Sequence, residues 1–535
     1  MRNSRVIIAK NIKLDKRYVS VLQYTEQQMI NLMTDNNNLV YTSNTYSFLR
    51  EEKNSINVKI PYGTALQGNY LAFQNPDYSN KWFFAFIDNV NYVSDGVTKI
   101  NYTIDIFTTW WEYWSSKACF VVREHVTDDT IGLHTIPENL ETGEYILNES
   151  VINDNTLGDV CYIVGATTFP NMSKAEDSLC GAGEYNGVYS ACKYFRYDTV
   201  SALDIVLELW NKAGKIDSVT CVFMAPKIMC PITATTDNEG NPQNTVSESS
   251  GAYYYSKLIS KQTTLDGYSP VNNKLKCYPY NYLYATNNSG GNAIYRYELF
   301  RGSSVEFGVN CALVPGCSIR SNTIGYKATN NSMVNYSEGM TAGKYPICNF
   351  ANDVYTNWLT QQSVNMPYDT LKSTVTGATG GAVVGGIPGA IFGATMGFIG
   401  TIWQQMREKE NHQFIPPQVE GNLNAGDVNA SLGITCFSYY KMSIREEFAR
   451  IIDAYFTRFG YLVNTFKVPN FTHRENYNYV EISNSDTLCY SNNHNNIMVP
   501  ASDLDGINNI FRNGVTLWNN HTNLGDYSVS NNITQ

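Results

Sequence analysis

Two runs of alternating residues flank a tight turn in the stretch WFFAFIDNVNYVSDGVTKINYTIDI, residues 82–106. In the first run, Phe84 and Phe86 fall on one side and Ala85 on the other, and in the second run every other residue is apolar. Such alternation is typical of β-strands, and the Asp95-Gly96 pair between two such runs is a strong hairpin signal. The stretch predicts an antiparallel sheet with one covered face.

The composition of the 535-residue chain also favours a strand-rich fold. Tyr (39) and Phe (23) are abundant and favour strands, while Asn-rich runs such as residues 36–38 favour turns. Hydrophobic residues make up 43% and charged residues only 16%, against about 25% charged in an average globular protein. The chain is therefore expected to be folded, with roughly two to four domains.

Four helices are expected to pack against the sheets, and each begins with a capping signal. The last three also have an apolar stripe and a terminal glycine, at positions 214, 460 and 514. No chemistry is assigned to these helices. The predicted first residues, each with its partner three positions on, are Thr25 with Gln28, Ser201 with Asp204, Ser443 with Glu446, and Ser502 with Asp505.

Charge and cysteine content exclude several classes of protein. The net charge of −10 argues against a nucleic-acid binder that lacks sequence preference, because such a protein needs a basic surface. Twelve cysteines without a Cys-x-x-Cys pair are expected to be mostly buried free thiols, compatible with a reducing cytoplasm. The apolar run at residues 6–9 is too short for a signal peptide, so we expect no secretion.

No catalytic motif occurs in the sequence. There is no His-Glu-x-x-His motif, zinc-spaced Cys/His cluster, phosphate-binding Gly-Lys-Ser/Thr loop or Gly-x-Ser-x-Gly elbow. Acid pairs such as Glu138 and Glu141 are uninformative unless the fold brings two carboxylates together. We therefore predict that the protein is not an enzyme and has no catalytic residue, metal or cofactor.

The most unusual segment runs from Ser373 to Met406 and holds no charged residue. It is long enough to cross a hydrocarbon core, which needs about 20 apolar residues, although Pro388 in its middle would break a helix. Glycines at every fourth position would form a bare groove for close packing, yet each costs a helix about 1 kcal/mol relative to Ala. The apolar residues are Val383, Val384, Ile387, Ile391, Phe392, Met396, Phe398, Ile399, Ile402 and Trp403, and the glycines are Gly377, Gly381, Gly385, Gly389, Gly393 and Gly397.

Three interpretations of this segment remain open from the residues alone. It is a permanent membrane anchor, a buried glycine-rich hairpin, or a conditionally exposed membrane-active loop. An exposed apolar patch of this size causes aggregation, so a membrane-active loop must be sheltered in the soluble form. The interior of an oligomer would cover the apolar surface of such a loop.

Several motifs occur in a fixed order along the rest of the chain. They are FQNPDYSNKWFFAF at 73–86, FVVREHV at 120–126, YPY at 278–280, IPPQ at 415–418, the helix at 445–460, and NGVTLW at 513–518 followed by residues 523–529. In this order they resemble the distal tail knob, or distal tube, protein of small short-tailed bacteriophages of Gram-positive hosts. Residues from about 150 to 275 carry no such likeness.

The resemblance implies a homo-hexameric tube with β-rich walls in the distal tail of the virion, made in the host cytoplasm. Viral DNA leaves through its lumen without specific binding, and the proximal tube and the tail tip are its partners. Long apolar loops plug the lumen and then form a pore in the host cell membrane. The matching residues here are 374–403, with Pro388 at the tip of a hairpin whose arms are residues 374–386 and 389–403, as helices or strands.

These arguments predict a mainly β (α+β) fold with a few packed helices, an inserted lobe and a long apolar loop. The predicted parts are an N-terminal β-rich tube domain at 1–150, an inserted knob lobe at 151–275, a second tube-forming part at 276–372, the plug or membrane loop at 373–406, and a C-terminal part at 407–535 that returns to the tube with two helices. The alternative function is a tail protein that binds or cleaves host cell-wall polysaccharide through the 151–275 lobe.

Overall fold

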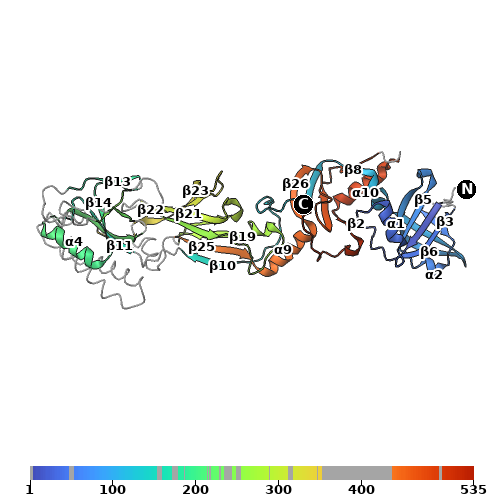
Figure 1. Ribbon diagram of the computed structural model, residues 1–535, viewed down its shortest axis with the longest axis horizontal. Helices are drawn as coiled ribbons and strands as arrows, with labels where there is room; N and C mark the ends of the chain where they lie inside the picture. Colours follow the sequence, from blue (N-terminus) through green and yellow to red (C-terminus); the bar gives the residue numbers. More distant parts are fainter. Residues whose placement is uncertain are drawn as a thin grey trace. The chain divides into compact units, whose positions relative to one another are not determined.

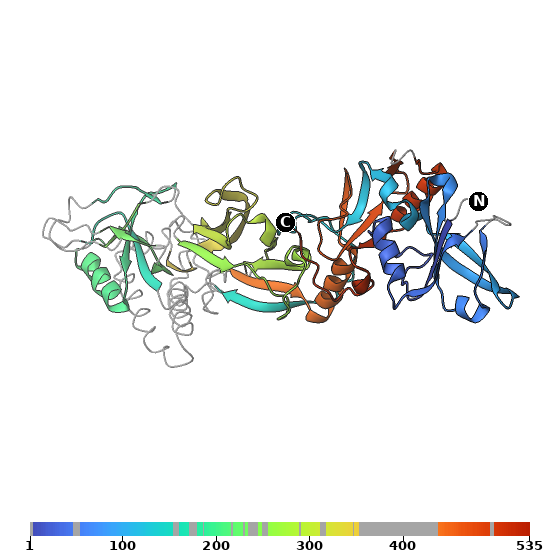
Figure 2. The same cartoon turned by 45° about the vertical axis from the view of Figure 1, so that its right-hand side comes forward.

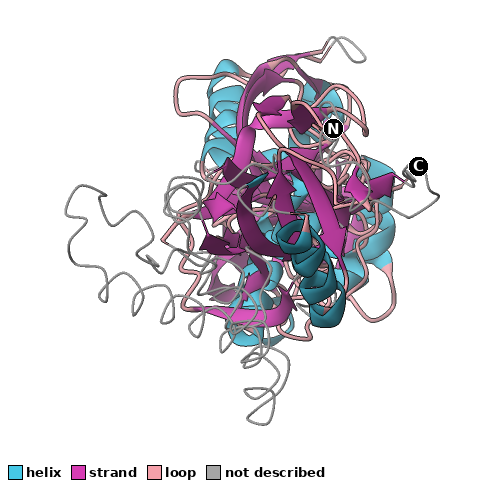
Figure 3. Ribbon diagram, turned by 90° about the vertical axis from the view of Figure 1, so that its left-hand side faces the viewer, coloured by secondary structure: helices cyan, strands magenta, loops and turns pink. Residues whose placement is uncertain are grey.

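The structure, a computed structural model, divides into two compact units. Unit 1 comprises Met1–Glu141, Pro270–Leu275 and Glu447–Gln535, and unit 2 comprises Thr142–Ser269 and Lys276–Glu446. The residues that the structure describes are 4–46, 54–152, 160–170, 179–185, 187–213, 215, 218–227, 230–233, 244–248, 255–287, 290–310, 317–345, 347–351, 437–492 and 497–534. Strands, drawn in magenta in Figure 3, dominate the described residues, so the predicted mainly β fold class is confirmed.

A six-stranded antiparallel sheet, blue in Figure 1, forms the N-terminal part of unit 1. The predicted hairpin at residues 82–106 is confirmed, because Ser94 of one strand pairs with Val97 of the next across the turn. Ile106 is the exception, since it begins a short helix instead of extending the second strand. In sheet order the strands are β3 (Leu39–Tyr46), β1 (Ser4–Ala9), β5 (Tyr70–Asn75), β6 (Lys81–Ser94), β7 (Val97–Ile104) and β4 (Ser55–Val58).

Both faces of this sheet are covered by apolar packing, so the prediction of a single covered face is wrong. Phe84 and Phe86 face helix α1 (Glu26–Thr34), while Ala85 packs on the opposite face, as the alternation predicts. The first helix also begins as expected, because Thr25 and Gln28 form a complete capping box. The short helices α2 (Tyr62–Ala65) and α3 (Ile106–Trp110) complete this part.

A second sheet of unit 1 joins segments from the two ends of the chain. Its central strand β27 pairs with β29 on one side and β9 on the other, and β2 pairs in parallel with β29. Its strands in order are β2 (Ser20–Leu22), β29 (Val515–Trp518), β27 (Tyr477–Ile482), β9 (Cys119–Glu124) and β26 (Tyr461–Lys467), and a separate pair is formed by β28 (Cys489–Ser491) and β8 (Trp114–Ser116). Residues more than 300 positions apart in the sequence thus share one sheet.

The described residues of unit 2 form three larger sheets and one small pair. The first has the order β10 (Tyr145–Ile152), β25 (Ser438–Ile444), β19 (Asn281–Thr286) and β20 (Asn292–Tyr295). The second has the order β16 (Ile232–Thr233), β17 (Thr245–Val246), β14 (Lys193–Tyr197), β11 (Val160–Ala166), β15 (Val219–Pro226) and β24 (Ile347–Ala351). The third has the order β18 (Tyr255–Ser260), β21 (Ser304–Asn310), β22 (Cys317–Ile324) and β23 (Val334–Tyr345), and the small pair is β12 (Gly183–Tyr185) with β13 (Val188–Ser190).

One hydrophobic core runs through unit 2 and includes helix α4 (Val200–Lys212). The predicted stripe of this helix is confirmed, since Leu203, Val206, Leu207 and Trp210 are all buried. The eight cysteines whose side chains the structure describes are buried free thiols, as expected.

Three of the four predicted helix starts are wrong in detail, although each helix exists. Helix α9 (Glu446–Phe459) begins after Ser443, which lies buried in β25, and the carboxylate of Asp266 accepts the N–H of Glu446 at 3.1 Å. Helix α4 is capped by Thr199 instead of Ser201, and α10 (Ala501–Arg512) follows Pro500 without a side-chain cap from Ser502. Neighbouring strands and distant side chains, which a local motif does not contain, decide these boundaries.

Candidate functional site

All residues of the predicted plug lie outside the part of the chain that the structure describes. This applies to the apolar set from Val383 to Trp403, to Pro388 within it, and to the glycines from Gly377 to Gly397. The described candidate site is the frame of unit 2, defined as the strands β24 and β25 that precede and follow residues 352–436, with their supporting residues. A second set of buried residues, the anchor, lies in unit 1.

The two sides of the frame belong to different sheets of unit 2. Upstream, β24 pairs with β15, so that Ala351 lies opposite Val222. Downstream, Phe437 and Tyr439 are buried in the same hydrophobic core that contains Val222. The phenol of Tyr439 is hydrogen-bonded to the hydroxyl of Ser321 at 2.8 Å. The described residues of this packed body therefore end at residue 351 and resume at residue 437.

Strand β25 is fixed on both of its edges and by buried polar contacts. It pairs along its length with β10 and β19, and Figure 2 shows it in orange between these two strands. Lys441, which is buried, has its Nζ 2.7 Å from a carboxylate oxygen of Glu149 and donates to the hydroxyl of Ser260 at 2.8 Å. The Ser443 hydroxyl accepts the amide of Asn148 at 2.8 Å. These contacts hold the downstream side of the frame in register.

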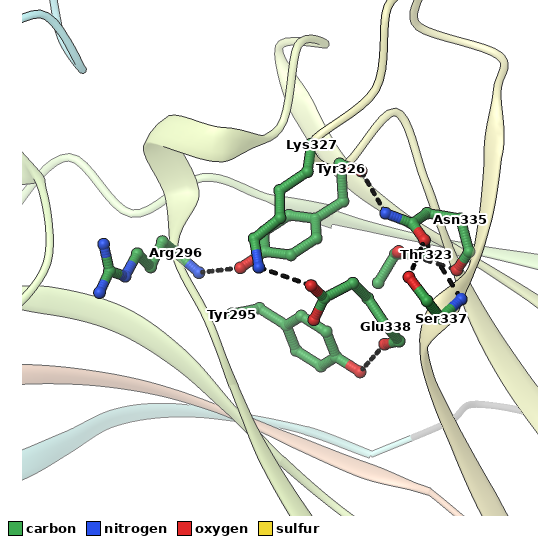
Figure 4. A network of polar contacts seen from close by, with 8 residues as sticks. All are labelled: Tyr295, Arg296, Thr323, Tyr326, Lys327, Asn335, Ser337 and Glu338. Atoms are coloured by element: carbon green, nitrogen blue, oxygen red, sulfur yellow. Dashed lines mark hydrogen bonds and ion pairs between the residues drawn. The ribbon is translucent and has the colours of Figure 1, made fainter.

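The edge strand β20 is fastened to the sheet of β22 and β23 by the polar network in Figure 4. The buried Tyr295 donates its hydroxyl to the carbonyl of Glu338 at 2.8 Å, and the Glu338 carboxylate pairs with Lys327 at 2.5 Å. The amide of Asn335 donates to the carbonyl of Tyr326 at 3.1 Å. The network thus closes the turn between β22 and β23 over Tyr295.

In unit 1, the segment FVVREHV at 120–126 supplies the first part of the anchor. Arg123 donates to the carbonyl of Gly460 at 2.8 Å and forms an ion pair with Glu138. The Glu138 carboxylate also pairs with Lys274 and accepts the N–H of Leu462 at 3.1 Å. All three charged side chains are at least nine-tenths buried. Because a buried carboxylate is costly without partners, the two cations and the amide donor offset the cost of burying Glu138.

The second part of the anchor holds residues 270–275, a unit 1 segment that has unit 2 sequence on both sides. The buried carboxylate of Asp453 accepts the N–H groups of Val271 and Asn272 at 2.8 and 3.0 Å, and the Asn272 amide at 2.7 Å. Asp129 accepts the N–H of Asn273 at 3.0 Å. Charge-assisted bonds of this kind are about twice as strong as neutral ones, so they fix the path of the chain at this point.

His125 occupies the third part of the anchor in its neutral form. Its Nδ1 accepts the N–H of Tyr479 at 2.7 Å, which leaves the proton on Nε2, and Nε2 donates to the carbonyl of Thr457 at 3.0 Å. Burial lowers the pKa of His125 to about 3, because the charged form would be desolvated. The Asn470 amide donates to the carbonyl of His125 at 2.8 Å. The ring is thus satisfied only while it is uncharged.

The sequence alone does not reveal the anchor, apart from the 120–126 motif that forms part of it. Asp129 and Asp453 have no spacing that marks them, and Glu138 appeared only as one acid among 48. The one available signal was the ionisable triplet at 123–125 inside an otherwise apolar, strand-like run. Its partners Gly460 and Tyr479 lie 337 and 354 positions away in the sequence and meet it only in the folded unit.

The described residues contain no arrangement that points to metal chemistry or to a membrane-spanning helix. No group of three or more His, Cys, Asp or Glu side chains that would hold a metal ion occurs among them. No helix in the described ranges is long and apolar enough to cross a membrane. The anchor carboxylates are instead engaged by cations and amide donors, which suits a structural role.

Comparison with known proteins identifies the class of this fold as a phage tail protein. The family model described as the Caudoviral major tail protein N-terminus matches residues 2–114. The family model described as the C-terminal domain of the Bacillus phage phi29 tail knob protein gp9 matches residues 242–532, more than half of the chain. The chain therefore belongs to the tail knob protein family, as the motif resemblance predicts.

Full-length relatives and a solved structure agree with this assignment. The tail knob protein gp9 of Bacillus phage phi29 is 23% identical, with 91% of each chain covered, and that of Bacillus phage B103 is 23% identical, with 87% of each covered. The structure of the bacteriophage C1 tail knob protein gp12 matches the whole chain with a TM-score of 0.65 at 12% identity, which shows a shared fold. The protein is thus a structural component of a phage tail.

Proposed function

We propose that this chain forms the distal tube of the tail, through which the viral DNA is ejected. Six copies assemble into a ring whose apolar loops, residues 374–403, first close the lumen and then form a pore in the host cell membrane. The parts 1–150, 276–372 and 407–535 supply the tube, and 151–275 supplies the knob lobe. The protein acts in the virion beside the proximal tube and the tail tip, without catalysing a reaction.

One observation carries the proposal: the charge-free segment 373–406 lies within a long insertion between two strands of a packed body. The strands on either side, β24 and β25, belong to sheets that share one core with Phe437 and Tyr439. Such a frame supports a segment that changes its surroundings, because the fold of the frame does not depend on where the segment lies. Membership in the tail knob family supports a tail function for this segment.

The physical driving force for release is burial of apolar area in lipid, which contributes about 25 cal/mol per Å². In a closed tube the same surface is hidden by the loops of neighbouring copies, and the small residues favour close contact between them. The closed lumen and the bilayer both bury the apolar surface of the loops. Transfer of the loops from lumen to bilayer is therefore thermodynamically accessible.

The direct test replaces residues 374–403 by a short Gly/Ser linker and measures dye leakage from liposomes. The variant should keep the oligomeric state of the natural chain, measured by light scattering, and should cause no leakage. Leakage equal to that of the natural chain would refute the pore function. Loss of the oligomer on deletion would refute the idea that the frame folds and assembles without the loop.

A point variant separates membrane insertion from mere loop length. Phe398→Lys places a charge in the apolar segment, and a Lys at the centre of a membrane-spanning segment costs about 2.5–3.5 kcal/mol. Leakage should therefore fall steeply at equal protein concentration. The matched control is Leu179→Lys, which changes a described side chain that is 76% exposed in unit 2 and should leave leakage unchanged.

A further inference from the structure

The outer face of the sheet β10-β25-β19-β20 in unit 2 is uncharged and rich in tyrosine. Alternate residues of these strands point inward, where Leu283, Ala285, Tyr295 and Tyr439 join the core. The pairing places the other set side by side on the opposite face, because Tyr284 lies opposite both Tyr440 and Ile294, and Met442 lies opposite both Tyr282 and Leu147. Figures 1 and 2 show β10, β25 and β19 adjacent in this order.

The tyrosines of this outer face form a continuous group and remain partly accessible. The ring of Tyr282 lies 5.3 Å from that of Tyr145 and 6.0 Å from that of Tyr278, and the Tyr284 and Tyr440 rings are 6.2 Å apart. Tyr145 is 37% exposed. No side chain or backbone group in the described ranges hydrogen-bonds the hydroxyls of Tyr145, Tyr282, Tyr284 or Tyr440. The face thus offers flat rings together with available hydroxyl groups.

Charge excludes a nucleic acid as the occupant of this face. Nucleic-acid sites need several cations along the phosphate backbone, but none of the outward residues named above is charged. Arg296, at the rim, lies 4.4 Å from the centre of the Tyr278 ring and is engaged there. A platform with stacking rings and without cations suits a neutral ligand.

Area argues against a second protein as the main occupant. Four strands at about 4.8 Å spacing, each presenting about five residues at about 3.4 Å, make a face of roughly 330 Å². A standard protein interface buries about 800 Å² of accessible surface on each partner and would extend beyond a flat footprint of this size. The face is instead large enough for a few units of a linear polymer.

We infer that this tyrosine face binds a neutral polysaccharide chain. Sugar rings present apolar C–H faces that pack on aromatic rings, and their hydroxyls match the phenol groups that the described residues leave available. The network of Figure 4 fixes β20, the edge strand of this sheet, through Tyr295. The platform is therefore preformed, and little ordering is needed on binding. The site is distinct from the apolar loop and does not depend on the pore function.

The test screens the full-length protein against neutral hexasaccharides built from glucose, N-acetylglucosamine, galactose or rhamnose, with an anionic hexasaccharide and oligo-dT as further probes. The natural chain should bind at least one neutral hexasaccharide. The double variant Tyr284→Ala with Tyr440→Ala should weaken binding about tenfold or more, since each stacking contact accounts for about 2- to 10-fold. Ile294→Lys, which keeps all rings and adds a charge to an exposed position, should weaken it as well.

The matched control is Tyr336→Ala, which removes a 54% exposed tyrosine from β23 of the same unit and should leave binding unchanged. Thermal unfolding of each variant checks that the fold is retained, and Ile294→Lys keeps the test valid if the double variant unfolds. Absence of binding to every neutral hexasaccharide overturns the inference. Preferential binding of oligo-dT, self-association that the face variants abolish, or equal loss of binding in Tyr336→Ala also overturns it.

Discussion

Acid should destabilise unit 1 through the buried imidazole of His125. The unfolded chain binds a proton on this ring near the ordinary pKa of 6.5, whereas the folded protein binds it only near pKa about 3. Between these values the unfolded state binds more protons, so the free energy of unfolding rises with pH and falls as the solution becomes acidic. At pH 5, about 1.5 units below the unfolded pKa, His125 alone lowers the free energy of unfolding by about 2 kcal/mol relative to pH 8.

The variant His125→Asn isolates this contribution. The Asn side-chain oxygen reproduces the acceptor that Tyr479 uses, while the bond from Nε2 to Thr457 is lost, which costs about 1 kcal/mol at any pH. The variant should therefore be less stable at pH 8, yet lose about 2 kcal/mol less than the natural chain between pH 8 and pH 5. His473→Asn, which removes an exposed ring, is the control and should follow the natural chain.

Urea titrations at a series of pH values provide the measurement. Tryptophan fluorescence reports mainly on unit 1, which holds five of the eight tryptophans, including Trp110 and Trp518. The unfolding free energy follows from linear extrapolation to zero urea. Equal losses of stability for the natural chain and His125→Asn between pH 8 and pH 5 would refute the assignment of a neutral, desolvated imidazole.

Two further changes test the anchor. Glu138→Gln leaves two buried cations without their carboxylate and should lower the unfolding free energy by about 3–5 kcal/mol, while Glu208→Gln at a surface ion pair should cost about 1 kcal/mol or less. Gly460→Ala forces a side chain into a positive φ of 66° and against the Glu124 carbonyl, so it should cost at least about 1–2 kcal/mol. Gly96→Ala, with open space around it, is the matched control. Similar losses of unfolding free energy in Glu138→Gln and Glu208→Gln, or in Gly460→Ala and Gly96→Ala, would contradict the structure.

The sequence by itself determined the local elements and the compositional oddity. The β6–β7 hairpin followed from period-2 alternation and from Asp95-Gly96, because strand direction and turn geometry depend on adjacent residues. The apolar stripe of helix α4 followed from local periodicity in the same way. Residues 373–406 were recognisable as the candidate site because the absence of charge over so long a stretch requires no knowledge of the fold.

Only the tertiary structure decided which residues support that site and which face is available for binding. Asp453 meets Asn272 across 181 positions and Glu138 meets Lys274 across 136, and no local pattern encodes such pairs. Even the start of α9 depends on Asp266, 180 positions before it. The tyrosine face likewise appears only when β10, β19 and β25 are brought together, since each strand alone contributes no more than two of its rings. Side chains that are distant in the chain become partners through sheet pairing and burial. Local periodicity does not specify which strands pair or which residues meet.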